Sequence, residues 1–379
     1  MTRKNWVLID AENQTAVENL TIAEQGVTLV KKRLKAGLSA GVDVLEIDNG
    51  VLSLTILPTR GMGIWRGQCG TASLRWQSPV HGPVHPAFVP VADGSGVGWL
   101  YGFDEWFVRC GLENNGAPQF NENGQLIYSL HGRIANTPAS RVEITVDSET
   151  GEILVEGTVY ESRLFSKHLE LKTRYAFKAG ETGFRLQDVA TNLSASPKEI
   201  VLLYHINTGL PFVQSGSRLV VPFEEMAPRT FAAADDLANW NVCKKGTPGV
   251  EEVVYFFNPA ADANGDTEVL FINNTNEQAI RLGFNKKQLP LFSFWKSRLP
   301  DEDGFVVGIE PSVNFPNTTG FESRHGRTVR LAPKESREFD LKFAFTLNKE
   351  ETFNAEQSLL KNYPAVGTIH KNPKPEWSE

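Results

Sequence analysis

From about Val42 onward, short runs of alternating apolar and polar residues dominate the chain, and turn residues separate them. In residues 169–177, Leu, Leu, Thr, Tyr and Phe occupy every second position, while Glu, Lys and Arg fill the positions between the first four. This period of two is typical of a half-buried antiparallel strand. We predict turns at residues 148–151 and 178–183, which join neighbouring strands into hairpins.

The same design continues in the second half of the chain. The runs there are again short and bounded by Gly, Pro, Asn or Asp: EVLFINN, QAIRLGFN, PLFSFWKS, GFVVGIEP, TVRLAPKES and REFDLKFAFTL. Helical periodicity is weak and is found at residues 233–240 and 351–361. Many short strands with regular turns favour an all-β sandwich or barrel over a fold that alternates strands and helices.

No Pro/Ser-rich linker divides the chain, and an all-β sandwich can exceed about 200 residues as one unit. We therefore expect a single domain over residues 1–379, with an N-terminal segment at 1–41, a β-sandwich core at 42–347 and a C-terminal tail at 348–379. The final residues, KNPKPEWSE, are polar and rich in Pro. We expect them to lie loosely on the surface.

The strand pattern lapses between Trp76 and Gln125, a stretch that we call the insertion. It carries many glycines and an aromatic group made up of Trp99, Tyr101, Phe103, Trp106 and Phe107. A long glycine-rich segment in a compact domain is either a functional loop or disordered. Because disordered segments are poor in aromatic residues, we expect the insertion to be ordered.

Composition and charge narrow the class of protein. The chain is 41% hydrophobic and 22% charged, as in globular proteins, and its net charge of −7 argues against a nucleic-acid partner. No segment reaches the roughly 18 apolar residues of a membrane span. The N-terminal residues have four apolar positions in a row, too few for a signal peptide, so we expect a cytoplasmic protein. Cys69, Cys110 and Cys243 show no CxxC spacing, so neither a disulfide framework nor a zinc knot is predicted.

Three residues are candidates for acid/base chemistry. His131 in YSLHGR, His205 in LLYHINTG and Glu310 in GIEP each end an apolar run before a turn. Catalytic groups favour the junction between a rigid strand and a loop, although each residue taken singly could be structural. A zinc ion could also accept His, His and Glu, but all three lie far apart in sequence, which disfavours a metal. The shared setting makes an acid/base site the better hypothesis.

Other residues could bind a sugar next to this site. Trp295 and the aromatic residues of the insertion could stack on a pyranose, while Arg60, Arg109 and Asn207 could form hydrogen bonds with its hydroxyls. Core packing is the alternative for each aromatic residue. The chain has no GxSxG nucleophile motif and no phosphate-binding loop with the required Lys and Ser/Thr.

The chain resembles the aldose 1-epimerase (galactose mutarotase-like) superfamily, and more closely an uncharacterised bacterial branch of it. The motifs that carry the resemblance span residues 42–347: LPTRGMGI, GFDEWFVRCGLENNGAP, SLHGR, DVATN, LLYHINTG, and FWKS followed by GIEP. The insertion is unlike that of a typical galactose mutarotase, so the sugar stays open.

The resemblance implies a β-supersandwich with an open cleft and interconversion of the α and β anomers of an aldose without metal or organic cofactor. Glu310 would remove the proton from the anomeric hydroxyl, His205 would protonate the ring oxygen, and His131 would bind and polarise the sugar. Two alternatives stay open: a lyase or isomerase acting on an oxidised or modified sugar, and a noncatalytic carbohydrate-binding module. The expected partner is a small-molecule sugar, and a homodimer is left open.

Overall fold

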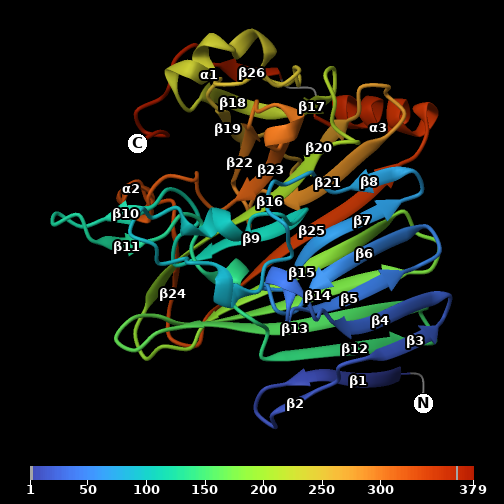
Figure 1. Ribbon diagram of the computed structural model, residues 1–379. Helices are drawn as coiled ribbons and strands as arrows, with labels where there is room; N and C mark the ends of the chain where they lie inside the picture. Colours follow the sequence, from blue (N-terminus) through green and yellow to red (C-terminus); the bar gives the residue numbers. More distant parts are fainter. Residues whose placement is uncertain (1–2, 364–365) are drawn as a thin grey trace.

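A computed structural model describes residues 3–363 and 366–379, which form a sandwich of two large sheets (Figure 1). Within these residues the first sheet has ten strands, in the order β17 (Arg218–Val220), β20 (Asp266–Ile272), β21 (Ala279–Asn285), β25 (Ser336–Thr346), β15 (Gly183–Asn192), β14 (His168–Lys178), β13 (Glu152–Ser162), β12 (Arg141–Asp147), β1 (Arg3–Asp10) and β2 (Thr15–Ala16). All its pairings are antiparallel.

The second sheet contains β16, the strand that carries His205. It runs β26 (Val366–Ile369), β18 (Phe223–Pro228), β19 (Val253–Pro259), β22 (Leu291–Lys296), β23 (Val306–Ser312), β16 (Lys198–Gly209), β9 (Phe107–Leu112), β7 (Gly63–Cys69), β6 (Leu52–Leu57), β5 (Asp43–Asp48), β4 (Val27–Arg33) and β3 (Leu20–Glu24). Two short strands join it at the side, β24 (Val329–Leu331) on β16 and β8 (Ala72–Leu74) on β7. A separate hairpin of β10 (Gln119–Phe120) and β11 (Leu126–Tyr128) projects from the body (Figure 1).

Helices are short and peripheral within the described ranges. The α-helices are α1 (Phe231–Asp235), α2 (Thr319–Arg324) and α3 (Lys349–Asn362), and the 3-10 helices are Gly37–Ser39, Pro86–Phe88, Gly98–Gly102, Ile134–Asn136, Leu237–Asn239 and Asp301–Asp303. The two predicted helical segments correspond to α1 with the 3-10 turn after it, and to α3. None of the helices in residues 3–363 and 366–379 is both long and apolar enough to cross a membrane.

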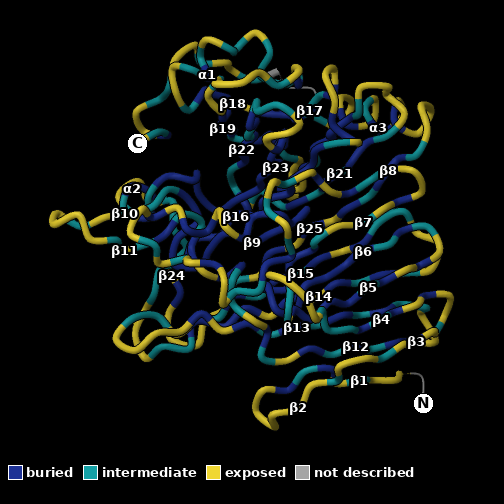
Figure 2. The backbone as a smooth tube through the Cα atoms, viewed as in Figure 1, coloured by how far each residue is buried: buried dark blue, intermediate teal, exposed yellow. Residues whose placement is uncertain are grey.

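The predicted all-β fold is confirmed, and so is the alternation from which it was derived. Leu169, Leu171, Thr173, Tyr175 and Phe177 are all buried between the sheets. The predicted turns at 148–151 and 178–183 join β12 to β13 and β14 to β15, which pair as antiparallel neighbours. Burying one face of each strand removes apolar side chains from water, which is the main driving force for such a sandwich. Figure 2 shows the result: the central strands are buried and the hairpin turns are exposed.

The structure differs from the sequence pattern in two places. The insertion is ordered, as expected, but it is not loop throughout, because it contains a central strand, β9, which lies between β16 and β7 and is buried at every position. A strand buried on both faces does not alternate, so the pattern missed it. The end of the tail does not lie loosely either, because Trp377 is buried against Phe315, with ring centroids 5.0 Å apart, and its carbonyl accepts a hydrogen bond from Asn317.

Candidate active site

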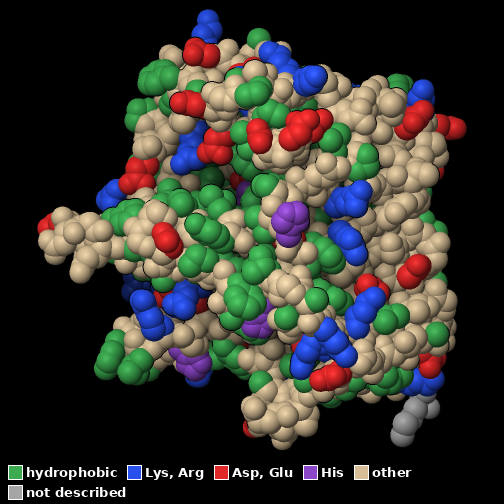
Figure 3. Space-filling view, in the orientation of Figure 1, with side chains coloured by type: hydrophobic (Ala, Val, Ile, Leu, Met, Phe, Trp, Pro, Cys, Tyr) green, Lys and Arg blue, Asp and Glu red, His purple; other side chains and the backbone are tan. Residues whose placement is uncertain are grey.

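Four of the predicted site residues, His131, His205, Trp295 and Glu310, line one cavity of about 570 Å³. Its floor is the second sheet, where β16, β23 and β22 are neighbours, and the insertion supplies much of its wall. Figure 3 shows hydrophobic side chains gathered on this face of the molecule, beside the base of the β10–β11 hairpin. The fold therefore brings together three candidate acid/base groups that are far apart in sequence.

His205 and Glu310 contact each other in the cavity. Both lie inside their strands, β16 and β23, so the prediction that they end strands is wrong. Ile206 pairs with Ile309, and this antiparallel register brings His205 opposite Glu310. Nε2 of His205 lies 3.2 Å from Oε1 of Glu310, and both side chains are buried.

A glycine makes room for this pair. A Cβ atom on Gly308 would lie 2.3 Å from Oε1 of Glu310 and 2.7 Å from Cε1 of His205. Separations this short do not occur between non-bonded atoms, so any larger residue at position 308 would displace both side chains. Gly308 in GIEP is thus part of the site although it carries no chemistry.

Burial shifts the titration of the pair in opposite directions. It raises the pKa of Glu310 well above the usual carboxyl range, and the negative charge of Glu252 adds to this while Arg229 opposes it. Burial also lowers the pKa of His205, and the nearby ring of His131 lowers it further. Because a low-dielectric site disfavours charged forms, this cavity favours a protonated Glu310 beside a neutral His205.

The pair is also short of hydrogen bonds. Nδ1 of His205 and Oε1 of Glu310 are buried and form no hydrogen bond with the described residues, because the 3.2 Å contact between Nε2 of His205 and Oε1 of Glu310 is not aligned as one. Nor do the hydroxyls of Ser293 and Ser312, the first of which pairs with Glu310 across β22 and β23. Buried polar atoms in native proteins are nearly always paired, so such a group of unpaired atoms marks a place where a ligand or water can bind.

His131 presents one ring nitrogen to the cavity. Its Nδ1 lies 2.8 Å from the carbonyl oxygen of Asn115. Since a carbonyl only accepts, Nδ1 carries the hydrogen, and Nε2 is left as an acceptor. Burial lowers the pKa of His131 to about 4, so the ring is neutral near pH 7. Its backbone φ of +57° lies in the left-handed region, an uncommon conformation that is found more often at functional sites.

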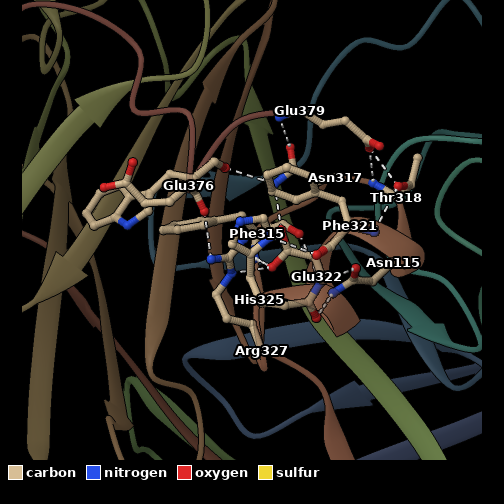
Figure 4. Close-up of polar contacts among 12 residues, drawn as sticks. Asn115, Phe315, Asn317, Thr318, Phe321, Glu322, His325, Arg327, Glu376 and Glu379 are labelled. Atoms are coloured by element: carbon tan, nitrogen blue, oxygen red, sulfur yellow. Dashed lines mark hydrogen bonds and ion pairs between the residues drawn. The ribbon is translucent and has the colours of Figure 1, made fainter.

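A network of amides and one buried carboxylate holds the loop behind His131. Asn115 exchanges two amide hydrogen bonds with Asn314, of 2.8 and 2.9 Å. Close by, the buried carboxylate of Glu322 accepts hydrogen bonds from Asn317 and Arg327 (Figure 4). These contacts fix the carbonyl of Asn115 and therefore the tautomer of His131.

Residues near the C-terminus close this network from outside. Arg327 donates to the carbonyl of Glu376, and the hydroxyl of Thr318 donates to the side chain of Glu379 at 2.6 Å (Figure 4). The tail therefore supports the loop that positions His131.

The aromatic residues pack around the two histidines. The ring of His205 lies 5.5 Å from Trp295 and from His131, and 5.6 Å from Phe103. Trp99 contacts His131 at 4.7 Å. Phe103 and Trp99 of the insertion, together with Trp295 of β22, thus surround the two histidines with aromatic rings and contribute to the burial that lowers their pKa values.

Arg60 and Arg109, predicted to bind substrate, do not reach the cavity. Nε of Arg60 binds Glu105 at 2.5 Å, and its other nitrogens donate to Asn136 and to the carbonyls of Val84 and Gly102. All three nitrogens of its guanidinium group donate to groups inside the protein, and three of the four acceptors belong to the insertion, which Arg60 therefore anchors.

Arg109 lies between the two sheets instead. Its guanidinium binds Asp188 at 2.5 and 3.0 Å and donates to Thr173 and to backbone carbonyls of residues 61 and 62. Asn207 is also outside the cavity lining, since its amide donates to the carbonyls of Glu105 and His205. Arg60 in TRGMG and Arg109 in VRCG both lie close to a glycine in the sequence, and such a position suits a core arginine as well as one that binds a ligand.

Three charged residues of the cavity lining, Arg229, Glu252 and Asp303, were not predicted, and the first two act on the reactive groups. Arg229 follows β18 and has no side-chain partner among the described residues, yet its charge acts on both Glu310 and His131. Glu252 precedes β19 and accepts a 2.7 Å hydrogen bond from Nε1 of Trp295. The sequence contexts of Arg229 and Glu252, APRTF and VEEVVY, carry no motif, and only the strand pairing places them here.

In the described part of the chain, no group of three or more His, Cys, Asp or Glu side chains is arranged to hold a metal ion. The expectation of a reaction without metal stays a prediction.

The architecture and the cavity floor define the class: the protein has the galactose mutarotase-like fold. A crystal structure of a candidate aldose 1-epimerase from Klebsiella pneumoniae is 32% identical, with a TM-score of 0.93 over 98% of this chain and 99% of that one. The chain belongs to the family described as a domain of unknown function, DUF4432, whose model matches residues 39–345.

More distant structures share the fold. A galactose mutarotase-like protein from Clostridium acetobutylicum is 15% identical with a TM-score of 0.56, over 84% of this chain and 98% of that one. A galactose 1-epimerase from Lactobacillus acidophilus is 11% identical with a TM-score of 0.53, over 85% and 99%. A comparison with curated protein sequences gives no match. The resemblance to the aldose 1-epimerase superfamily is confirmed.

Proposed function

We propose that the protein is a carbohydrate epimerase that interconverts the α and β anomers of an aldose. The observation that carries the proposal is the buried contact of 3.2 Å between His205 and Glu310, with His131 beside it in the same cavity. The candidate epimerase from Klebsiella, which shares the fold at 32% identity, supports it.

Anomer exchange requires that His205 and Glu310 together hold one proton that can be transferred. Ring opening takes a proton from the anomeric hydroxyl and gives one to the ring oxygen while the bond between C1 and the ring oxygen breaks. After rotation of the aldehyde, ring closure reverses both transfers. A pair with Glu310 as carboxylate and His205 as imidazolium holds the same number of protons as the pair with both groups neutral, and hydrogen bonds from sugar hydroxyls stabilise the charged form.

His131 has a binding role in this scheme. Its Nε2 accepts a hydrogen bond from a sugar hydroxyl, because Nδ1 is held as the donor by Asn115. Trp295, which lines the same cavity, offers its ring face to the pyranose.

The test follows the exchange of anomeric NMR signals for a panel of freshly dissolved aldoses. We expect acceleration over the spontaneous rate for at least one sugar, with EDTA leaving the rate unchanged. Glu310→Gln and His205→Asn should each lower this rate at least about 100-fold, as loss of a general acid or base does. No acceleration with any sugar would exclude the proposal.

Product analysis separates the proposal from its alternatives. A lyase acting on an oxidised sugar would create an ultraviolet-absorbing double bond, which anomer exchange does not. A noncatalytic module would bind sugar without turnover, and binding would survive Glu310→Gln. The proposal includes a cytoplasmic location, which fractionation of expressing cells tests.

A further inference from the structure

Glu310 lies in a row of side chains that crosses the second sheet. Antiparallel pairing sets His205 of β16 opposite Glu310, and sets Glu310 in turn opposite Ser293 of β22. Residues that pair directly project from the same face of a sheet, so all three side chains lie on the cavity side. Glu310 is therefore flanked by His205 on one side and by Ser293 on the other.

The hydroxyl of Ser293 is buried and forms no hydrogen bond with any residue that the structure describes. Such a hydroxyl costs free energy, and an alanine would occupy nearly the same space without that cost. The next residue in the row is Phe256 of β19, which pairs with Ser293 and stacks on Phe315 at 4.3 Å between ring centroids. Of the two neighbours of Ser293 in the row, only Glu310 has a side chain that can accept a hydrogen bond.

Ser293 and Glu310 are close enough to interact through their side chains. Directly opposed Cβ atoms of antiparallel strands are about 4.5–5.5 Å apart. The hydroxyl lies one bond beyond the Cβ of Ser293 and the carboxyl carbon two bonds beyond that of Glu310, so side-chain rotation can bring the two groups into hydrogen-bond distance. An ionised carboxylate accepts up to about four hydrogen bonds, which leaves room for His205 and Ser293 together.

Ser312 offers a contrast within the same face of the sheet. Its hydroxyl is also buried without a hydrogen-bond partner in residues 3–363 and 366–379. It lies two positions along β23 from Glu310, about 7 Å away, and it opposes Leu203 of β16 and Leu291 of β22. Ser312 thus matches Ser293 in residue type and burial but does not oppose the carboxyl group.

We propose that Ser293 is a positioning residue for Glu310: its hydroxyl donates a hydrogen bond to the carboxylate that forms when Glu310 gives up its proton. The inference rests on the proposed function, because anomer exchange is the reaction that requires Glu310 as a carboxylate. In that state the imidazolium of His205 lies on one side and the hydroxyl of Ser293 on the other, so the carboxylate keeps its place in the row.

The titration of Glu310 also depends on the groups around it. Titratable or charged side chains act on it, or lie with it in the cavity, from several elements: His205 on β16, Cys110 on β9, Arg229 after β18, Glu252 before β19, and His131 and Asp303 in the lining. Substitutions of Ser293 and Ser312 leave all of these groups in place. A change in the titration is therefore assigned to the lost hydroxyl.

The first measurement needs no sugar. Carbon-13 NMR of protein labelled at its glutamate carboxyls follows the ionisation of Glu310 with pH, and Glu310→Gln identifies its signal. Loss of a donor to the carboxylate favours the protonated form, so Ser293→Ala should raise the pKa of Glu310, with the proton bound about three- to tenfold more tightly. Ser312→Ala should leave this titration unchanged, and Ser293→Thr, which keeps a hydroxyl, should stay close to the unaltered protein.

Anomer exchange supplies the second measurement. Ser293→Ala should lower the exchange rate about three- to tenfold and move the alkaline limb of the pH–rate profile to higher pH, since that limb follows the pKa of Glu310. A serine with only a structural role would lower the stability to urea when replaced and leave the limb in place. We expect the stability of Ser293→Ala to be unchanged or higher, because a buried hydroxyl without a partner is removed.

An unchanged titration of Glu310 in Ser293→Ala overturns the inference, and so does an equal change in Ser312→Ala. If Ser293→Thr does not fold, the comparison of the two alanine variants decides the question alone. The titration is measured without sugar, so the proposed function is judged separately. A changed titration without anomer exchange for any sugar contradicts only the epimerase, whereas exchange with an unchanged titration contradicts only the role of Ser293.

Discussion

This sandwich contains two buried pairs of a carboxylic acid and a basic group, Arg109 with Asp188 and His205 with Glu310, and they differ in how completely they are hydrogen-bonded. Between the sheets, Asp188 receives two hydrogen bonds from Arg109 and further ones from Thr173 and Tyr204, so every group in the cluster is paired. In the cavity, His205 and Glu310 each leave a buried atom without a partner in the part of the chain that the structure describes.

The difference separates structure from function. The cluster of Arg109 and Asp188, in which the polar groups are hydrogen-bonded to one another, holds the two sheets together and has no free donor or acceptor for a ligand. The pair of His205 and Glu310 is incompletely hydrogen-bonded, which lowers the stability of the fold, and its unpaired atoms are where a substrate can bind. Arginine, aspartate, histidine and glutamate are all plausible site residues by type, but only the second pair is free to react.

The largest expected effect comes from breaking the paired cluster. Arg109→Met should lower the free energy of unfolding by about 3–5 kcal/mol, because it leaves Asp188 buried without its cation. Urea unfolding measures this. The control is Arg185→Met on β15, whose ion pair with Glu152 is exposed and should contribute at most about 1 kcal/mol. Equal losses for the two variants would contradict the comparison.

The next effect concerns the space around the reactive pair. Gly308→Ala should lower the anomer-exchange rate at least about tenfold, because the added Cβ displaces His205 and Glu310 from each other and from the sugar. Gly283→Ala is the matched control in another strand, since its Cβ would meet no atom closer than 3.7 Å. Full activity of Gly308→Ala would show that the contact between the two side chains is dispensable.

A smaller effect tests whether the site costs stability. The pKa of Glu310 is higher in the folded protein than in the unfolded chain, so the folded protein keeps this proton to higher pH. The free energy of unfolding therefore falls as pH rises above the pKa that Glu310 has in the unfolded chain. Glu310→Gln should therefore raise the free energy of unfolding by roughly 0.5–2 kcal/mol at pH 7, with no gain at pH 4.

The matched control for this substitution is Glu322→Gln. Glu322 is equally buried but accepts hydrogen bonds from Arg327 and Asn317, so its loss should destabilise the protein at pH 7. A loss of stability in both variants would place Glu310 with the structural carboxylates.

The smallest effect is a shift in pH dependence. Activity needs one proton on the pair, so the alkaline limb of the pH–rate profile follows the pKa of Glu310. Arg229→Gln removes a charge that lowers this pKa and should move the limb to higher pH, whereas Glu252→Gln should move it to lower pH. Both shifts are modest because solvent screens charges at the cavity mouth.

Trp295→Phe serves as the control for the second variant, since it removes the hydrogen bond to Glu252 and keeps the charge. Shifts of the same sign in Arg229→Gln and Glu252→Gln would show that at least one of the two residues does not act on Glu310 through its charge.

The sequence predicts the fold more clearly than the candidate site, for physical reasons. Alternation in residues 169–177 reports burial of one face, and the structure confirms it in β14. β9 has both faces buried and lacks that signal. Motifs led to His131, His205 and Glu310 because the family resemblance spans them, whereas Arg229 and Glu252 enter the cavity only through the pairing of β18, β19 and β22, which no local pattern specifies.

The seating of residues 376–379 on the loop that carries Asn314 has a practical meaning for handling the protein. An affinity tag fused after Glu379 would begin beside Thr318 and pull on contacts that reach His131 through Asn115. A tag placed ahead of the edge strands β1 and β2 would lie far from this network in the sheet order. Assays of the proposed reaction therefore call for N-terminal fusions, with removable linkers, as the default design.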